Sequence, residues 1–492
     1  MGDSKILSLL KKIGQLEVGV YVFVTVFLFY LFLWVVNPEN KIIAISFIGL
    51  FGFLYFRIKN YRLMLLFTYL ASLIVHTGKT YTIQLIPPGL YPAEWYPQGY
   101  LAYFAITPSL ILALIMGLIL FRDFVTGHLK LPKFKFYDLA LFFYFSWLII
   151  SDVFGSGMPK VSILFSITYI SFFIFYFYSR SYAKKGLGFI PALIGLFAAL
   201  IVFESITSFQ QFMGSSPLYK NIESQVGIEQ FGSASDELEF RFRPVGTFEH
   251  ANILGMWMSF CLSVIFVYFY KKRTKSLLLI LSLGFVSLIL TLSRSAWLGI
   301  IVSLLFSLYI LENVKKIKPP LIFKKYSLSF ILVFLVLILF FIFPRAEKSL
   351  YALNEGGGYF RYLQIQDTLP IILKNPLFGV GTGMSVVEGL NFNPKGFYSR
   401  VPLAIHNWYL LLLAEHGIPG LLFFIMFLWL ALRENLNLIW KGKMTTDIQV
   451  VRLGFVAGAL SLVIVGFFQP FLGEYLIFLA FAILGSSYYE KS

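Results

Sequence analysis

Apolar runs long enough to cross a lipid bilayer recur along almost the whole chain. The first covers residues 18–36, and later runs follow at intervals as far as Tyr488. A helix of about 20 apolar residues spans the hydrocarbon core of a bilayer, so each run is a candidate transmembrane helix. The pattern predicts an all-α polytopic membrane protein with about 12–14 transmembrane helices.

The composition excludes an ordinary soluble fold. Of 492 residues, 58% are apolar and 13% are charged, whereas about 25% of the residues of a soluble domain are charged. The first apolar run is too long for the core of a cleaved signal peptide, so we expect it to remain as the first span. The only cysteine, Cys261, lies in an apolar run, which excludes an intrachain disulfide and a cluster of thiolate metal ligands.

Lysine and arginine gather in six connections between the apolar runs, and such connections stay on the cytoplasmic side. They are residues 57–62, 122–135, 180–185, 271–275, 315–325 and 433–443. Two spans separate each consecutive pair, so all six are predicted to share one side and both termini to be cytoplasmic. The net charge of +16 is spread over these short connections, which argues against a nucleic-acid partner.

The outward connections are then residues 81–100, 151–160, 210–251, 293–295 and 344–405. Two of them, 210–251 and 344–405, are long and polar, which indicates that the functional residues lie on the outer face. We therefore divide the chain into residues 1–209, which show only spans, and residues 210–492, which include both long loops.

Two arginines lie on the outward side, against the usual charge bias. Arg243 precedes a span at the end of the first long loop, and contact with lipid headgroups or pairing with Asp236, Glu237 or Glu239 would explain it. Arg294 lies in a connection so short that two spans almost merge, and an interfacial anchor would explain it as well. Alternatively, two guanidinium groups on one face suit bidentate hydrogen bonds to a diphosphate.

An apolar helix is predicted to begin at about His406 and to be kinked or broken at residues 417–420, where glycine and proline interrupt it. His406 would then stand at a helix N-terminus, where backbone amides favour anions. An imidazole is also a frequent general base near neutral pH. A plain polar contact at the interface is the alternative, and it applies equally to the other histidines, which are His76, His128, His250 and His416.

Three glutamates lie in or near predicted spans, where carboxylates are costly. Glu474 lies close to the outer interface and is expected to be hydrated. Glu415 would be about 14 Å deeper than His406, and it is expected to line a watery cavity. Glu204, near the outer end of its span, is expected to orient the polar groups of the outer face.

Four motifs in the second half of the chain resemble those of the O-antigen ligase and O-antigen polymerase superfamily of glycosyltransferases. His406-Asn407 is followed after nine residues by Gly417 and after two more by Gly420, which is similar to the histidine and glycine motif of that family. Residues 243–248, RPVGTF, are similar to its Arg-x-x-Gly-Thr-Phe segment.

The other two motifs also lie on connections predicted to face outward. Ser293-Arg294 resembles the Ser-Arg-Gly turn of the family, with Ser295 in place of the glycine. Arg361 together with residues 375–381, NPLFGVG, resembles the arginine and the Pro-Leu-x-Gly-x-Gly stretch of its large outer loop. The motifs occur in the family's order, so together they carry more weight than any one of them.

The resemblance implies a GT-C-like membrane glycosyltransferase that takes a glycan from a polyprenyl-diphosphate carrier. It would work in a bacterial inner membrane, among membrane lipids, with its active site facing the periplasm or the exterior. The acceptor would be a glycan, the lipid A core or another molecule with a hydroxyl group. The family's reaction is metal-independent and inverting, so no metal or other cofactor is expected. His406 would be catalytic, as the general base, Arg243 and Arg294 would bind the diphosphate, and Arg361 would bind the donor or the acceptor.

Two alternatives stay open at this point. A ligase and a polymerase share the donor and differ in the acceptor, so the motifs do not separate them. A transporter or flippase of lipid-linked glycans would also need many spans and arginines along a cavity. The unusual residues gather at one face, without internal repeats or charged sites at the middle of the membrane, which favours the transferase.

Overall fold

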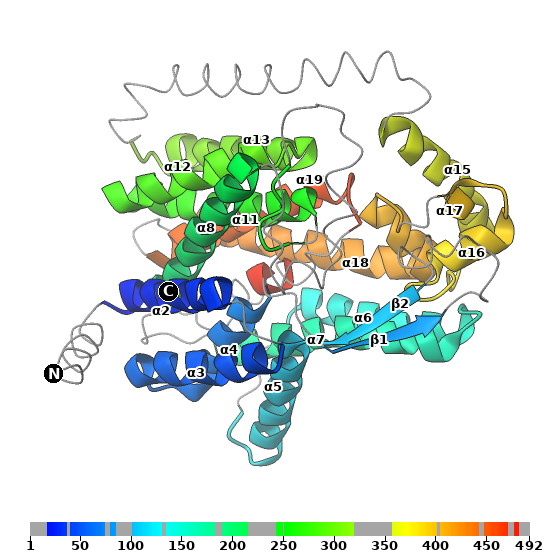
Figure 1. The fold of residues 1–492 in the computed structure, drawn as a ribbon, viewed down its shortest axis with the longest axis horizontal. Helices are drawn as coiled ribbons and strands as arrows, with labels where there is room; N and C mark the ends of the chain where they lie inside the picture. The colour runs from blue at the N-terminus through cyan, green and yellow to red at the C-terminus, as the bar shows by residue number, and fades with distance from the viewer. Residues whose placement is uncertain are drawn as a thin grey trace.

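The computed structural model confirms a bundle of long apolar helices (Figure 1). It describes residues 17–36, 40–73, 79–84, 101–129, 134–182, 189–214, 243–248, 250–318, 357–400, 404–441, 447–470 and 477–481. Within these ranges, eight helices are long and apolar enough to cross a membrane, and three shorter apolar helices accompany them. The fold class of an all-α polytopic membrane protein is therefore confirmed. The total of 12–14 spans stays a prediction, because residues 319–356 and 482–492 lie outside the described residues.

The helices of the first half are α2 (Val18–Val36), α3 (Asn40–Ile58), α4 (Tyr61–Ser72), α5 (Pro108–Val125), α6 (Phe136–Phe154), α7 (Pro159–Tyr182) and α8 (Phe189–Gly214). The long helices of the second half are α11 (Ala251–Lys272), α12 (Lys275–Leu290), α13 (Arg294–Leu308), α18 (Trp408–Lys441) and α19 (Asp447–Val465). A π-helical turn, Tyr309–Val314, extends α13. Three shorter helices, α15 (Gly357–Lys374), α16 (Ser385–Phe392) and α17 (Phe397–Arg400), lie in the second long outward connection.

A small antiparallel hairpin precedes α5, which the helical pattern did not predict. Its strands are β1 (Lys79–Gln84) and β2 (Leu101–Ile106), and Lys79 lies opposite Ile106. Both strands are rich in β-branched and aromatic residues, which favour a pleated backbone. The two strands lie at the ends of the first outward connection, so they add to the helical bundle.

Helices α8 and α11 form the centre of the bundle, since most of their residues are buried. Helix α2 packs closely on α8: a Cβ atom added to Gly195 would lie 2.1 Å from the carbonyl oxygen of Gly19. Only glycine permits this approach of two backbones, which is a common way for membrane helices to associate. Helix α8 in turn packs along α12, and α6 packs along α18, so the residues before 209 form one bundle with the second half. The two-part division of the chain stays a prediction.

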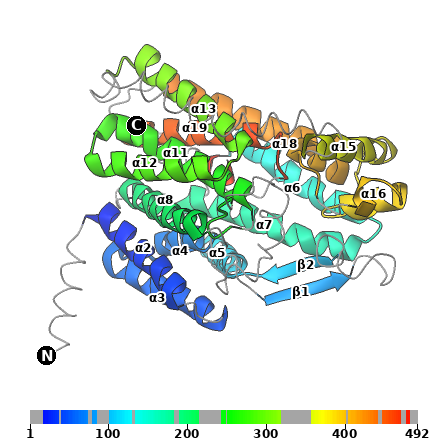
Figure 2. The ribbon, with the colours of Figure 1, turned by 45° about the horizontal axis from the view of Figure 1, so that its top comes forward.

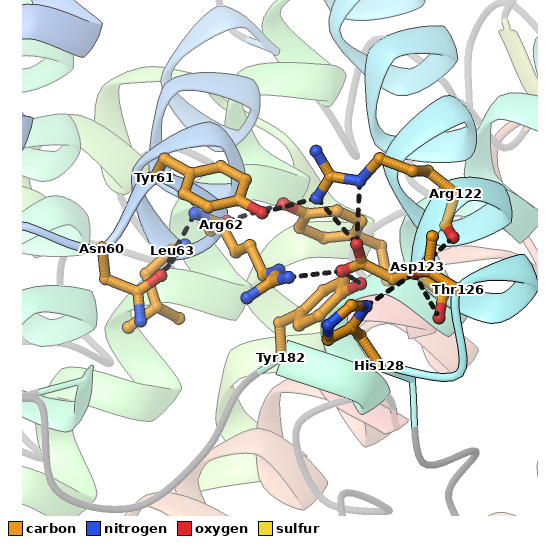
Figure 3. A network of polar contacts seen from close by, with 10 residues as sticks. Asn60, Tyr61, Arg62, Leu63, Arg122, Asp123, Thr126, His128 and Tyr182 are labelled. Carbon is orange, nitrogen blue, oxygen red and sulfur yellow. Dashed lines mark hydrogen bonds and ion pairs between the residues drawn. The ribbon is translucent and has the colours of Figure 1, made fainter.

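One buried carboxylate, Asp123, joins three of the predicted cytoplasmic connections (Figure 3). It accepts hydrogen bonds from Arg62 Nη2 at 2.6 Å, Arg122 Nη2 at 2.7 Å and the Tyr182 hydroxyl at 2.5 Å. These residues come from the start of α4, the end of α5 and the end of α7. His128 lies in the same region, where its Nδ1 atom is 2.7 Å from Thr126 Oγ1.

The other basic connections are joined to this region by a series of contacts. Lys135 pairs with Glu434 at 2.7 Å. Lys315 Nζ donates to the carbonyl of Trp440 at 3.1 Å, and Arg273 Nη2 donates to the carbonyl of Lys318 at 2.6 Å. All six basic connections are thereby linked at one end of the bundle, as their charge predicted. We call this end the basic face.

Candidate functional site

Two side chains of helix α8, Glu204 and Gln211, fix the backbone around the first arginine motif, residues 243–248. They are seven residues apart, which places them two turns apart on the same face of the helix. Gln211 Oε1 accepts from the N–H groups of Val245 and Gly246 at 3.0 and 2.8 Å, and its Nε2 donates to the Gly246 carbonyl at 2.7 Å. Glu204 accepts from the N–H and hydroxyl of Thr247 at 3.0 and 2.5 Å. Glu204 therefore orients the backbone of the motif, in line with the expectation for this residue.

Arg243, the first residue of this segment, connects it to two helix ends. Its Nε donates to the carbonyl of Thr291 at 3.1 Å, and its Nη2 donates to Asn252 Oδ1 at 3.2 Å. His250 has a structural role here, because its Nδ1 accepts from the Asn252 N–H at 3.0 Å and caps α11. The acidic residues considered as partners, 236, 237 and 239, lie outside the described residues.

Arg294 is the first residue of α13, and only residues 291–293 separate it from the end of α12. The turn is fixed by Trp297, whose indole donates to the carbonyl of Leu288 at 3.0 Å. The Arg294 side chain is exposed, and it makes no hydrogen bond or ion pair with any residue that the structure describes. The predicted tight connection is confirmed, and it presents a guanidinium group whose donors face solvent.

Arg361 lies near the start of α15 and three residues before Gln364, so that both are on neighbouring turns of one helix face. Gln364 is buried, and its Oε1 accepts from the N–H of His406 at 2.8 Å while its Nε2 donates to the carbonyl of Ala404 at 3.0 Å. The carbonyl of Ala404 also acts on the His406 ring, where it favours the protonated imidazole. Gln364 thereby fixes the backbone from which the imidazole projects.

Electrostatic effects show that the four predicted site residues lie near one another. Burial lowers the pKa of Arg243 to about 10, with a further contribution from the charge of Arg294. Burial and the same Arg294 charge lower the pKa of Arg361. Burial and the charge of Arg361 lower the pKa of His406 to about 4. We call Arg243, Arg294 and Arg361 the cationic cluster, and His406 lies beside it.

Three helices begin around the cationic cluster, and each presents its N-terminal end there. Helix α11 begins beside Arg243, α13 begins at Arg294, and α18 begins two residues after His406. Asn407 caps α18 by accepting from the N–H of Leu410 at 3.1 Å. The positive ends of helix dipoles add to the charge of the arginines, so the region favours an anion.

The same three helices end at the basic face. Helix α11 ends at Lys272, α13 with its π-helical turn ends at Val314, and α18 ends at Lys441. The 22 residues of α11 give a length of about 33 Å, close to the thickness of a bilayer's hydrocarbon core. The cationic cluster and the basic face are therefore separated by the thickness of a membrane.

The predicted interruption of α18 is present at Gly417, where φ is 66° and ψ is −173°. A helix break here, followed by Pro419, frees the carbonyls of Ala414 and Glu415. The N–H groups of Val380 and Gly381 donate to these carbonyls at 3.0 and 2.9 Å. The glycine motif of α18 and the 375–381 segment are thus two halves of one docking contact.

The reverse contact completes the docking. The N–H of Ile418 donates to the carbonyl of Pro376 at 2.8 Å. A Cβ atom added to Gly417 would lie 2.1 Å from the carbonyl oxygen of Leu377, so no larger residue fits without displacement of the segment. The glycines of both motifs therefore have a structural role. His406, which precedes the outer end of α18, lies instead beside the cationic cluster.

Helix α6, from the first half of the chain, supports the same contact. Ser151 Oγ donates to the carbonyls of Phe378 and Glu415 at 2.5 and 2.8 Å, and the Trp147 indole donates to the carbonyl of His416 at 2.9 Å. The bonds to Glu415 and His416 go to carbonyls next to the interruption of α18. Residues of α6 thus help to position the site, which their own sequence did not indicate.

The remaining glutamates and histidines lie away from the cationic cluster or outside the described residues. Glu415 is 5% exposed and accepts from Ser385 Oγ at 2.8 Å, so it is packed among polar groups. His416 is fully buried, with its Nδ1 atom 3.5 Å from Ser151 Oγ. Glu474 and His76 lie outside the described residues.

Comparison with known families gives independent support for the resemblance stated above. The motifs that carry this resemblance are also the segments that the contacts above bring together. Residues 277–425 match the family model for O-antigen ligase. The resemblance to the O-antigen ligase superfamily is thereby confirmed for this region, which we call the O-antigen ligase region. It includes Arg294, Arg361, His406 and the docking contact, while Arg243 lies before it. No curated protein matches the chain at a significant level.

Sequence reasoning missed two residues that position the site. Gln364 orients His406 in the O-antigen ligase region, and Gln211 orients the segment that begins with Arg243. Neither residue belongs to a motif, and an amide in a helix carries no signal of its own. Gln364 lies one helical turn after Arg361 on the same face, which is the only sign of it in the sequence.

Proposed function

We propose that this protein is a glycosyltransferase that moves a glycan from a polyprenyl-diphosphate carrier to an acceptor hydroxyl. The reaction takes place on the outer face of a bacterial inner membrane, toward the periplasm or the exterior. The observation that carries the proposal is the cationic cluster beside His406, at the end of the bundle opposite the basic face. The match to the O-antigen ligase family supports the same class of reaction.

Arg243 and Arg294 bind the diphosphate of the donor. Burial lowers the pKa of Arg243 and Arg361, and the charge of Arg294 lowers it further, because like charges close together repel one another. A diphosphate relieves the repulsion and gains charge-assisted hydrogen bonds from the guanidinium groups. As the bond from the anomeric carbon to the phosphate oxygen breaks, its electron pair passes to the diphosphate, and the cationic cluster stabilises the added charge.

His406 accepts the proton of the acceptor hydroxyl as its oxygen attacks the anomeric carbon. The lowered pKa keeps the imidazole neutral at physiological pH, which is the state that a general base requires. One ring nitrogen of a neutral imidazole carries no hydrogen, and this nitrogen takes the incoming proton. Attack on the face opposite the leaving diphosphate inverts the anomeric configuration, and no metal ion takes part, as the family resemblance implies.

Arg361 has a bridging place in this mechanism. Its charge acts on His406, and the charge of Arg294 acts on Arg361, which supports a position for Arg361 between the base and the diphosphate. We assign Arg361 to the donor, at the junction between the sugar and the phosphate. There its charge also favours the neutral form of His406 until the donor binds.

The test is the glycan distribution in the native host, resolved by carrier and by acceptor. Wild type is compared with His406→Ala expressed at the same level. His128→Ala is the matched control, because His128 is an exposed histidine at the opposite, basic face. We expect His406→Ala to abolish transfer and His128→Ala to behave as wild type.

The form of the defect separates the possible reactions. Single repeat units that accumulate on the carrier identify a polymerase, whereas full-length glycan on the carrier with a bare acceptor identifies a ligase. A distribution unchanged in His406→Ala contradicts the proposed base and directs attention to a transporter or flippase of lipid-linked glycans. Analysis of the new linkage by NMR tests inversion, and an assay of the purified protein with a chelator tests metal independence.

A further inference from the structure

Helix α15 has an exposed apolar face on the side away from Gln364. Four large side chains form this face: Tyr362, Ile365, Leu369 and Leu373, which are 56%, 36%, 46% and 77% exposed. Their spacing of three, four and four residues places them along one side of the helix. We call this the apolar face of α15. Gln366, at the edge of this face, donates to the Tyr362 hydroxyl at 2.6 Å, and Lys374, farther around the helix, is exposed.

The apolar face of α15 continues into an exposed apolar surface on α18. Leu377, just beyond α15, is exposed, and the neighbouring Pro376 carbonyl accepts the N–H of Ile418. From Ile418, exposed apolar residues follow α18 at helical spacing, namely Ile418, Leu422, Ile425 and Trp429. A candidate transmembrane helix with such a face presents it to the acyl chains.

Hydrogen bonds near the two ends of α15 fix the position of this helix along the length of α18. Gln364 contacts the backbone at residues 404 and 406, before α18 begins, and Pro376 contacts Ile418. Ten residues of helix separate Trp408 from Ile418, which corresponds to about 15 Å. Helix α15 thus runs inward beside the outer turns of α18. In Figures 1 and 2 it lies at the end of α6 and α18 where α16 is also found.

The part of α18 after its break places the outer turns at the membrane boundary. Residues 418–441 correspond to about 36 Å, against about 30 Å for the hydrocarbon core. The turns before Gly417 therefore lie at the outer boundary of the core, on the side of the cationic cluster. An apolar face at this level is within reach of the acyl chains of the outer leaflet.

We propose that α15 is a membrane-interface helix whose apolar face contacts the acyl chains of outer-leaflet lipids. Continuity with the apolar surface of α18 is the reason to assign lipid, and not a protein partner, to this face. The bilayer would then support one side of α15, while the opposite side presents Gln364 to the backbone at His406. If the proposed function is correct, the lipid contact also sets the cationic cluster at the level of the headgroups, where the diphosphate of a lipid-linked donor lies.

The test measures lipid contact directly, without an activity assay. Single cysteines at positions 365 and 369 are labelled with an environment-sensitive fluorophore in the full-length protein, in nanodiscs of defined lipid without added donor. Lys374→Cys is the matched control on the same helix, and Leu422→Cys is the reference for the surface of α18. The native Cys261 is buried within α11, and labelled wild type measures its background.

We expect the labels at 365 and 369 to be blue-shifted and quenched by nitroxide-bearing lipids, at a depth of about 5–10 Å below the headgroup boundary. The label at 374 should be quenched by aqueous iodide instead. Equal access of iodide to all three positions would overturn the proposal. So would labels that are shielded from both quenchers, because protein then covers the face, or labels that become blue-shifted only when a polyprenyl diphosphate is added. None of these outcomes depends on glycosyl transfer, so the proposed function is tested separately.

Discussion

The buried amide of Gln364 accepts a hydrogen bond of 2.8 Å from the backbone N–H of His406. The same amide donates to the Ala404 carbonyl at 3.0 Å. One side chain therefore holds the backbone on both sides of residue 405 and fixes the position of the proposed base. Gln364 is a positioning residue in this arrangement, since it acts on the reaction through His406.

Replacement of Gln364 tests this relationship. We expect Gln364→Ala to lower kcat by about 10- to 100-fold, because the loss of two backbone hydrogen bonds corresponds to about 1–3 kcal/mol. KM for the donor should change little. Gln366→Ala is the matched control, an exposed glutamine on the same helix, and should leave kcat unchanged. Equal losses in the two variants, or a loss explained by the amount of folded protein, would show that Gln364 has a general structural role.

The pH dependence of transfer tests the electrostatic coupling of Arg361 to His406. A general base is active in its neutral form, so kcat/KM should fall as the pH decreases through the pKa of His406, which is about 4. Arg361→Gln removes a charge that lowers this pKa. The acid limb of the profile should then move to higher pH, toward the ordinary histidine value, whatever the effect on maximal rate. An acid limb at the same pH in wild type and Arg361→Gln would contradict the coupling.

The geometry of the Arg294 side chain predicts that a lysine is a poor substitute. We expect Arg294→Lys to lower kcat/KM by about 10- to 100-fold, because an ammonium group cannot form the bidentate hydrogen bonds of a guanidinium group. The melting temperature should stay unchanged, since Arg294 has no partner among the described residues. Arg433→Lys, at an exposed arginine of the basic face, is the control. Unchanged kinetics of Arg294→Lys would favour an interfacial anchor.

Pyrophosphate offers a binding test for the same group. A ligand that binds the folded state raises the melting temperature by mass action. Pyrophosphate should therefore stabilise wild type and Arg433→Lys, and should stabilise Arg294→Gln much less. Similar shifts in all three proteins would show that the anion binds elsewhere.

The break in α18 predicts a large effect of a small substitution. Gly417 has a positive φ of 66°, and an added Cβ would lie 2.1 Å from the Leu377 carbonyl oxygen. Gly417→Ala should lower the free energy of unfolding by about 2–4 kcal/mol, by backbone strain and by displacement of the docked segment. Gly49→Ala is the control in α3, where no atom lies within 4 Å of the added Cβ. It should be neutral or stabilising by up to about 1 kcal/mol. Equal melting temperatures of the two variants would contradict the docking contact.

Local signals were sufficient to predict a good part of this molecule. The tight connection at Arg294 and the break at Gly417 follow from residues next to them in the sequence. The shared side of the basic connections follows from charge alone, and the contacts of Asp123 and Lys135 confirm it. The hairpin of β1 and β2 was missed, because a search for long apolar helices gives no information on strands in the connections.

The contacts that complete the site could not be predicted, because their partners are far apart in the sequence. The docking of Val380 and Gly381 on Ala414 and Glu415 depends on where α18 is interrupted in space. Gln364 differs from any other polar residue of an amphipathic helix only through its contact with residues 404 and 406. The motifs thus predicted which residues have chemical roles, and tertiary structure determined which residues position them.

The hydrogen bonds of Ser151 have a consequence for the order in which the protein is made. Its partners Phe378 and Glu415 lie 227 and 264 residues later in the chain. During synthesis, α6 is therefore inserted into the membrane long before Phe378 and Glu415, whose carbonyls pair with Ser151, have been translated. The arrangement around His406 can be completed only after α18 has emerged from the ribosome. A nascent chain that stalls before residue 376 accordingly lacks the docking contact, however many of its helices already cross the membrane.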